Sequence, residues 1–355
     1  MPIPTVKFYS AEKRVPMLKY DFPKAELHLH LDGSIKPETM WRMAKEKNIP
    51  LPTETLEEFR KWIEITADCR DVAQYLERFA LPCSLLQDAE SLAAVTEELI
   101  GTLAEINYCY AEIRFAPQKH TDAGMTQRDA VEAVLEGRRR GLEKNPNIRI
   151  GIILCGMSIG PETVNMDENL ETVRVAKEYL GKGVVGCDLA GAEGIVPLTN
   201  FRPFSDACLT AGIPLTMHAG ENAGPQPVRE VMSLGTQRIG HGHRIWEDPE
   251  LCREALEKGI TFEICPTSNI QCRTEPSYPE HPAKKMLDYG LKVCINNDNM
   301  VLAATNIEKE YDHCIEEMGF TIRDLVRMNI NAVSAAFLMP DEEKQEMIQK
   351  LESYL

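Results

Sequence analysis

Eight short apolar stretches recur along this 355-residue chain, and a longer amphipathic segment follows most of them. The stretches are nearly continuous in apolar residues, as in "IRIGIILCGM" at 148–157, which is typical of parallel strands buried on both faces. The segment "NLETVRVAKEYL" at 169–180 instead has apolar residues at helical spacing. The predicted strands cover 25–32, 109–117, 148–157, 184–191, 214–221, 238–245, 261–269 and 292–299. This alternation predicts an α/β fold, a (β/α)8 TIM barrel.

The segment between the first two predicted strands, about 35–105, is longer than one connecting helix and has a largely helical pattern. We therefore expect a single barrel domain over 1–355 with a helical insertion after the first strand. Its apolar side chains either close over a bound ligand as a lid or only pack the insertion onto the barrel, and both interpretations stay open. These residues are Trp41, Phe59, Trp62, Leu81, Leu85 and Leu86.

Charge and cysteine usage exclude several classes of partner. The net charge is -16 and there is no basic stripe, which argues against a nucleic-acid partner because phosphates favour clustered Lys and Arg. No window approaches the roughly 20 apolar residues of a membrane span, and the first residues lack an apolar signal core. The 11 cysteines occur without a CxxC pair, which favours reduced thiols in a cytoplasmic protein.

The stretch "AELHLHLDG" at 25–33 places His28 and His30 on one side of the first predicted strand, because residues two apart in a strand share a face. His218 and Asp298 lie at the ends of later predicted strands, and in a barrel these ends form one face. Two neighbouring core histidines would repel each other if protonated, which weakens the alternative that they are only packed. Three His and one Asp are ligands that suit zinc, with a position left for water. The fourth strand, "CDLAGAE", has no lysine to bridge two metals, so we expect one ion.

Glu221 follows His218 by three residues in "MHAGE", at the predicted turn out of the strand. A carboxyl group in a semi-enclosed pocket can stay protonated near neutral pH and act as a general acid, whereas the alternative is a surface glutamate. The stretch "GHGHR" offers His241 and His243, which strand alternation places on the same face, so the sequence does not choose between them. A metal-activated water beside an acid predicts a metal-assisted hydrolase.

Two further patterns narrow the hydrolase hypothesis. The H-x-E…P-C-x-x-C signature of zinc deaminases of the cytidine type does not occur. The remaining histidines, His120, His281 and His313, have no polar constellation around them in the sequence and are expected to be ordinary.

With these residues, the chain resembles the adenosine deaminase family of amidohydrolase barrels. The resemblance covers Phe22 to about Leu338 and rests on seven motifs in order: "HLHLDGS", "AEIRFAPQ", "DLAGAE", "MHAGE", "RIGHGHR", "CPTSN" and "NNDN". It implies a (β/α)8 barrel and a hydrolase that acts on a C–N bond of a cyclic amidine. The implied reaction is zinc-dependent deamination of adenosine and 2'-deoxyadenosine to inosine and 2'-deoxyinosine plus ammonia, by attack of an activated hydroxide on purine C6. The substrate would be a small purine nucleoside in purine salvage and catabolism.

The resemblance also implies roles for individual residues. One Zn2+ ion per subunit would be held by His28, His30, His218 and Asp298. Glu221 would protonate purine N1, while His241, with Asp298, would orient the attacking hydroxide. The residues implied to contact substrate are His30, Asp32, Gly191 and Asn299.

Within this set, Asp32 carries the preference for a nucleoside, because it would meet the ribose hydroxyls, whereas relatives that act on free adenine tend to have glutamate there. A cap on the following helix is the alternative role. Asn299 departs from the second aspartate that the family often has, yet its amide can donate to N7. The stretch "GMSIGPETV" also lacks the Met-Arg-His usual after the third strand.

Two competing hypotheses remain beside adenosine deamination. A sister deaminase would use adenine, 5'-methylthioadenosine or aminodeoxyfutalosine at the same site. A catalytically silent binding protein is less favoured, because every expected ligand and Glu221 are present.

Overall fold

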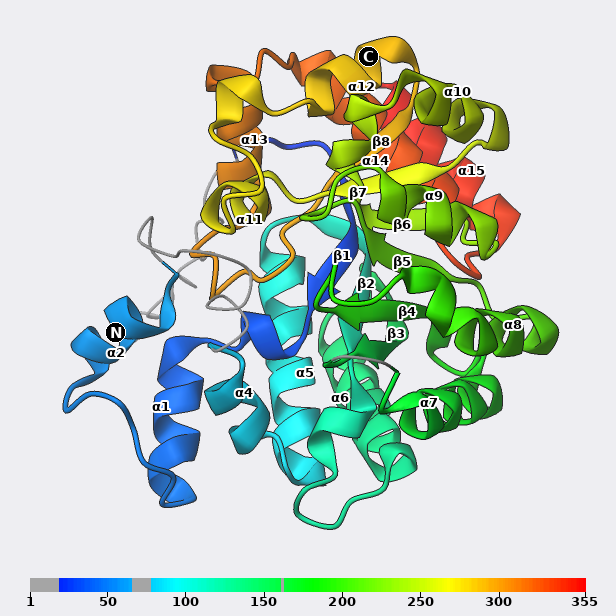
Figure 1. Ribbon diagram of the computed structural model, residues 1–355. Coiled ribbons are helices and arrows are strands. Elements are labelled where there is room, and N and C mark those ends of the chain that lie inside the picture. Colours follow the sequence, from blue (N-terminus) through cyan, green and yellow to red (C-terminus); the bar gives the residue numbers. More distant parts are fainter. Residues whose placement is uncertain (1–18, 66–77, 161–162) are drawn as a thin grey trace, which may run out of the picture.

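The structure is a computed structural model that describes residues 19–65, 78–160 and 163–355. Its eight strands lie in the centre and helices surround them (Figure 1). The strands are β1 (Lys24–His30), β2 (Tyr108–Phe115), β3 (Arg149–Ser158), β4 (Val184–Gly191), β5 (Thr216–Ala219), β6 (Arg238–His241), β7 (Thr261–Ile264) and β8 (Lys292–Ile295). All eight predicted strands are confirmed. The last four are shorter than predicted, because the polar C-terminal ends of those stretches leave the strand ladder and form loops or the starts of short helices.

The strands close into a barrel. Parallel pairing joins β1 to β4 in sequence order and β5 to β8 in the same way. The two halves meet at single parallel bridges, Cys187 with Leu215 on one side and Leu29 with Asp298 on the other. At the second bridge the His30 N–H donates to the Asp298 carbonyl at 2.8 Å, so closure of the barrel itself brings the first strand against the last strand's C-terminal loop. The predicted TIM barrel is therefore confirmed.

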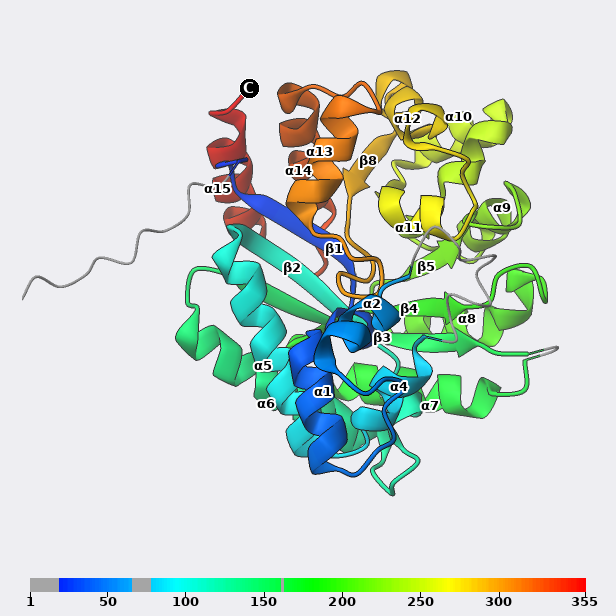
Figure 2. The same cartoon turned by 90° about the vertical axis from the view of Figure 1, so that its left-hand side faces the viewer.

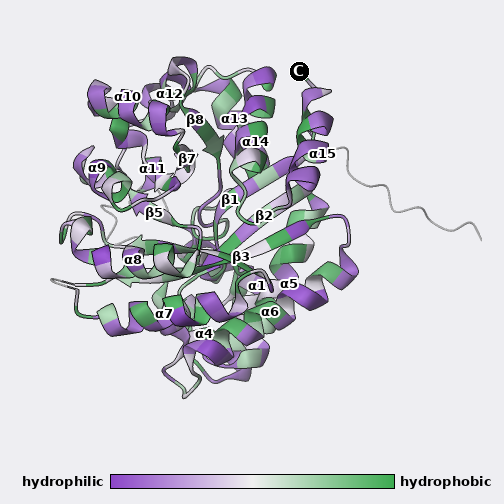
Figure 3. Cartoon of the chain, turned by 90° about the vertical axis from the view of Figure 1, so that its right-hand side faces the viewer, coloured by the Kyte–Doolittle hydropathy of each residue, from purple (hydrophilic) through white to green (hydrophobic). Residues whose placement is uncertain are grey.

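The outer layer consists of helices with one apolar face. Purple hydrophilic and green hydrophobic residues alternate along them in Figure 3, as expected for helices that cover a buried sheet. The helices after β2 are α6 (Gln127–Lys144), α7 (Met166–Tyr179), α8 (Arg202–Ala211), α9 (Gln226–Ser233), α10 (Pro249–Lys258), α11 (Pro266–Gln271), α12 (Ala283–Tyr289), α13 (Ile307–Glu316), α14 (Ile322–Ala335) and α15 (Asp341–Glu352).

The described parts of the predicted insertion are helical. They form α1 (Pro37–Glu46), α2 (Leu56–Ile63), α4 (Ala80–Leu85) and α5 (Ala89–Glu105), and the first three gather at one side of the barrel (Figure 2). The six apolar residues considered for a lid pack into or against the hydrophobic core, and none of them lines the cavity described below. Other residues of the insertion do line it, so the single domain with a lid over about 35–105 stays a prediction.

None of the helices among the described residues combines the length and the apolar composition that a membrane crossing requires. The ten cysteines in the described part of the chain are free thiols.

Candidate metal and substrate site

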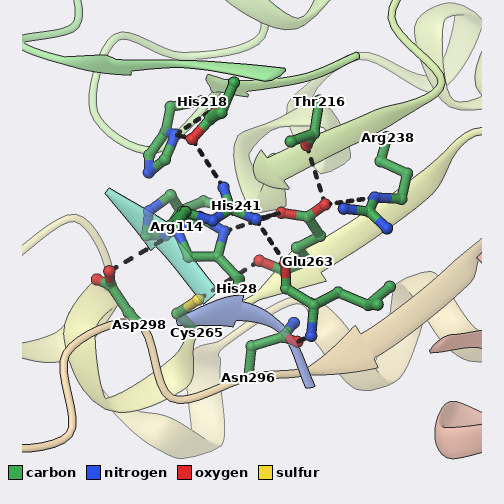
Figure 4. Close-up of polar contacts among 12 residues, drawn as sticks. His28, Arg114, Thr216, His218, Arg238, His241, Glu263, Cys265, Asn296 and Asp298 are labelled. Carbon is green, nitrogen blue, oxygen red and sulfur yellow. Dashed lines mark hydrogen bonds and ion pairs between the residues drawn. The ribbon is translucent and has the colours of Figure 1, made fainter. Parts of the chain in front are cut away.

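Four side chains predicted to bind metal converge at the C-terminal ends of the strands (Figure 4 labels three of them). His28 and His30 end β1, His218 lies on β5, and Asp298 follows β8. His30 Nε2 lies 3.3 Å from His218 Nε2, and Asp298 Oδ1 lies 3.5 Å from His30 Nε2 and 3.7 Å from His28 Nε2. The structure thus brings together two residues, His28 and Asp298, that are 270 positions apart in the sequence.

Buried carboxylates hold two of these imidazoles from behind. Glu263 Oε2 lies 2.9 Å from His28 Nδ1, and Asp188 Oδ2 lies 3.0 Å from His218 Nδ1. Each carboxylate accepts the Nδ1 proton, which leaves the Nε2 lone pair directed at the cluster. Arg114 bridges the two carboxylates, with Nη1 at 2.9 Å from Asp188 and Nη2 at 2.7 Å from Glu263.

Electrostatics act differently on the groups of the cluster: burial keeps His28 and His30 neutral and raises the pKa of Asp298, whereas the Asp188 carboxylate raises the pKa of His218. Burial holds the pKa of His28 and His30 well below the usual range, so both imidazoles are neutral. Burial opposes ionisation of Asp188, but the facing His218 and Arg114 side chains hold its pKa below the ordinary value. Neutral imidazoles backed by an ionised carboxylate are typical of metal-binding histidines.

The donor set fits a divalent metal ion. His28 Nε2 is buried and has no hydrogen-bond partner among the described residues. Two Nε2 atoms that both lack a proton would repel each other at the distance found between His30 and His218, unless a cation or proton lies between them. Geometry alone admits two groups of three ligands, His28 with His30 and Asp298, or His28 with His218 and His241. The site is therefore built to hold a metal among these five side chains.

Glu221 lies in the loop after β5, and a network of backbone amides positions that loop. The Glu193 carboxylate accepts hydrogen bonds from four successive N–H groups, those of residues 220 to 223. Glu221 Oε2 then lies 3.8 Å from His241 Nε2. Burial, with the negative charges of Asp298 and Glu193, raises the pKa of Glu221 to about 8. This carboxyl group can therefore keep a proton at neutral pH, as a general acid requires.

The structure shows which of the two histidines of "GHGHR" lies at the cavity: it is His241 and not His243. Strand β6 ends at His241, which has φ +59°, and Gly242 at φ +69° turns the chain into the 3-10 helix η4 (His243–Glu247). The expectation that alternation places both imidazoles on one face was wrong, because the strand does not continue past His241. His241 lines the cavity, whereas the His243 ring lies 5.3 Å from that of His281.

A cavity of about 560 Å³ opens over the cluster. His30, His218, His241, Glu221 and Asp298 line it, together with the predicted substrate residues Asp32, Gly191 and Asn299. Its other walls include residues from α4 and from the ends of β3 and β4.

Local backbone geometry places the predicted substrate residues. Asp32 is the first residue of the 3-10 helix η1 (Asp32–Ser34), which is separated from the end of β1 by one residue. A Cβ on Gly33 would lie 1.8 Å from Asn299 Oδ1, so only glycine leaves room for this asparagine. Gly191 has φ +114°, and a Cβ there would lie 2.5 Å from the Ser158 carbonyl oxygen.

Several residues of the site were not predicted from the sequence. Asp188 and Glu263 contact the imidazoles, Arg114 bridges these two carboxylates, and Glu193 holds the Glu221 loop. Asp188 and Glu193 belong to "DLAGAE", one of the motifs that carry the family resemblance, although the sequence alone predicts no role for these two acids. A buried acid in an apolar strand is an unusual signal that could have identified Asp188 and Glu263.

The chain is similar to known proteins along nearly its whole length. The family model described as "Adenosine deaminase" matches residues 23–354. A curated relative named adenosine deaminase, from Haemophilus ducreyi, is 39% identical over 322 residues, which cover 90% of this chain and 93% of the relative. Another of that name, from Enterococcus faecalis, is 36% identical and covers 94% of this chain and 96% of its own length.

Solved structures are similar over the same extent. The adenine deaminase from Arthrobacter aurescens has a TM-score of 0.84 at 25% identity, with coverage of 94% of this chain and 98% of the other. The N6-mAMP deaminase from arabidopsis has a TM-score of 0.82 at 25% identity, with the same coverage. Both the match along the sequence and the barrel geometry lead to one conclusion: the chain belongs to the adenosine deaminase family and is a hydrolase that acts on C–N bonds of cyclic amidines.

Proposed function

We propose that this protein deaminates adenosine and 2'-deoxyadenosine, with one water consumed and one ammonia released, and that it acts in purine salvage and catabolism in the cytoplasm. The observation that carries the proposal is a cavity in which a carboxyl group with a raised pKa, Glu221, faces a cluster of metal donors. The names of the curated relatives support the same substrate.

The metal in this proposal is zinc, with His28, His30, His218 and Asp298 as its ligands. A nitrogen and oxygen donor set of this kind suits zinc, which when bound supplies a nucleophilic hydroxide at neutral pH. The positive φ of Asp298, +58°, supports its role, because the chain adopts this uncommon conformation where it aims the carboxylate at His28 and His30.

The remaining polar residues act on the purine. Glu221 donates its proton to ring N1, which draws electrons from C6 and favours attack there. His241, which lines the same cavity, orients the attacking oxygen. Gly191 offers its backbone N–H to N3 and Asn299 donates to N7, so the base is held by its edge while C6 faces the cluster.

Asp32 supports a nucleoside over a free base. It is buried, it lines the cavity, and its Oδ1 atom has no hydrogen-bond partner among the described residues. A buried oxygen without a partner is costly, and a ribose hydroxyl would satisfy it. A bare adenine has no group to offer there once its ring edges are held as proposed.

The charge of the cavity supports a nucleoside over a nucleotide. Among the described residues that line it, Lys119 is the one lysine or arginine, against the four acids Asp32, Asp122, Glu221 and Asp298. A phosphate group would find only this one cationic side chain there, whereas phosphate sites favour several cationic donors.

A purine panel tests the proposal. Zinc-loaded enzyme is assayed with adenosine, 2'-deoxyadenosine, adenine, 5'-methylthioadenosine and AMP, and products are identified by mass. We expect inosine and 2'-deoxyinosine from the first two and much slower reaction of the others. Strong turnover of adenine with none of adenosine would establish the sister activity instead.

A further inference from the structure

His241 differs from the proposed metal-binding histidines in the group that faces its Nδ1 atom. Behind His28 and His218 that group is a carboxylate, Glu263 or Asp188, which can only accept a proton. Behind His241 it is the side-chain amide of Asn269, with Nδ2 at 3.0 Å from Nδ1. An amide can either donate or accept, so its orientation decides where His241 carries its proton.

A backbone amide sets that orientation. The N–H of Ala283, the first residue of α12, donates to His281 Nδ1 at 3.2 Å. His281 therefore has a lone pair at Nδ1 and its proton at Nε2, which lies 3.1 Å from Asn269 Oδ1. With its oxygen occupied by this donor, Asn269 turns its NH2 group to His241. His241 then accepts at Nδ1 and carries its proton at Nε2.

Hydrogen bonds run from Ala283 through His281 and Asn269 to His241, and this series is called the relay below. The relay is held in place and shielded from water. Asn269, His281 and His241 are 0%, 3% and 2% exposed. The backbone carbonyl of Asn269 accepts from the Thr274 hydroxyl and from the N–H groups of Thr274 and Glu275, which holds the residue in place. Burial lowers the pKa of His281 to about 3, in agreement with a neutral ring that can accept from Ala283.

We propose that Asn269, oriented by His281, is a positioning residue that makes His241 an N–H donor to the reacting centre. This inference rests on the proposed deamination for its role in catalysis. A protonated Nε2 has no lone pair to give a metal, which separates His241 from the ligand set although geometry alone allows it there. The Nε2–H also cannot take a proton from water, so His241 stabilises developing negative charge and does not act as a base.

The first test determines directly which ring nitrogen of His241 carries the proton. The imidazole nitrogens of ¹⁵N-histidine-labelled, zinc-loaded enzyme are correlated with their ring protons by NMR, and the His241 signals are assigned by their loss in His241→Gln. We expect His241 to carry its proton at Nε2, with Nδ1 bare, and His28 and His218 to carry theirs at Nδ1. A proton on His241 Nδ1 would overturn the proposal. This result does not depend on which purine the enzyme uses.

The second test reverses the relay with Asn269→Asp, a change of nearly the same shape. A carboxylate still accepts from His281 but demands a proton at His241 Nδ1, so the NMR pattern of His241 should reverse. Losing one donor to the reacting centre should lower kcat for adenosine about 100-fold to 1,000-fold with a much smaller change in KM. Asn331→Asp, in which the amide contacts only the Val293 carbonyl in the described chain, is the matched control and should leave the His241 signals unchanged.

A third test compares two variants of His281 and keeps the proposal testable if Asn269→Asp does not fold. His281→Gln retains an N–H group that can donate to Asn269, whereas His281→Leu has neither a donor nor an acceptor. We expect kcat of the Gln variant to exceed that of the Leu variant by about 10-fold or more at equal melting temperature. Equal kcat values and an unchanged His241 pattern in both would contradict the proposal. Absence of adenosine turnover in wild-type enzyme, with the expected NMR pattern, would instead reject only the proposed substrate.

Discussion

The acid role of Glu221 depends on a single proton, so it can be tested with the neutral amide of the same shape. Glu221→Gln cannot donate that proton to the purine ring, and we expect kcat to fall by about 100-fold to 10,000-fold. The metal content should not change, since Glu221 is outside the proposed ligand set. Turnover and zinc per chain are measured together, with the exposed Glu257→Gln as control. Full activity of Glu221→Gln would contradict the assignment.

The protonation of Glu221 also gives the pH dependence a direction. Its pKa is raised to about 8, and an acid is active only while it holds its proton, so kcat/KM should fall as pH rises through about 8. Asp298 and Glu193 contribute to this raised pKa through their charges. Glu193→Gln removes one of those charges and should move the falling limb of the kcat/KM profile to lower pH. A limb that stays in place or moves to higher pH would contradict this cause.

In the proposed function, recognition of the sugar depends on Asp32. Asp32→Asn keeps the shape of the side chain but removes the charge that would accept from ribose hydroxyls, and a charged hydrogen bond contributes about 1.5–3 kcal/mol. We therefore expect kcat/KM for adenosine to fall by about 10-fold to 100-fold. The residual reaction of free adenine is the internal control and should change little. An equal loss with both substrates would assign Asp32 to the metal site or to folding.

Individual residues could be predicted where their spacing carries information. His28 and His30 are two apart in a strand, which predicts a shared face, and the structure places both in the cluster. Asn269 and His281 could not be predicted, because their role depends on contacts across the loops after β7 that leave no periodic pattern. The expectation that His281 is an ordinary histidine stays a prediction, and the role proposed for it above rests on its contact with Asn269.

At the scale of elements, Glu263 on β7 links one of the proposed metal ligands to residues of several other strands. Glu263 contacts His28 on β1, Arg114 on β2, Thr216 on β5 and Arg238 on β6. A glutamate at the centre of a strand therefore acts both on the orientation of a ligand and on the stability of the sheet.

The two effects of Glu263 can be separated. Glu263→Gln should weaken zinc binding about 10-fold to 100-fold, because His28 loses the charged acceptor behind it. Glu112→Gln is the matched control, since Glu112 is equally buried and pairs with Arg238 but has no contact with a metal-binding histidine among the described residues. Both should lower the free energy of unfolding by about 3–5 kcal/mol, and only the first should change zinc affinity. Similar zinc affinities in the two variants would contradict the coupling.

The elements themselves were predicted well because buried parallel strands are nearly continuous in apolar residues. Their ends were not, since a strand that enters a functional loop changes conformation where its polar residues begin. At His241 and Gly242 that change is a pair of positive φ angles, and it turns His243 away from the cavity.

At the scale of the whole molecule, closure of the barrel assembles the site. The proposed ligands come from β1, β5 and the loop after β8, so a metal ion bound by them would connect both halves of the barrel. Binding to the folded state alone should raise the free energy of unfolding, by about 2.7 kcal/mol when free zinc is about 100 times the dissociation constant. Thermal unfolding at several zinc concentrations measures this increase. A melting temperature independent of zinc and of chelator would contradict a site that spans the barrel.

The most direct test of the central claim, one catalytic zinc ion in this cluster, is an activity titration. Metal is removed with a chelator, zinc is added back in known amounts, and adenosine deamination is followed by the change in absorbance. We expect no turnover without metal and a linear recovery that ends at one zinc ion per chain. Full turnover of the metal-free enzyme, or a recovery that ends only at two ions per chain, would contradict it.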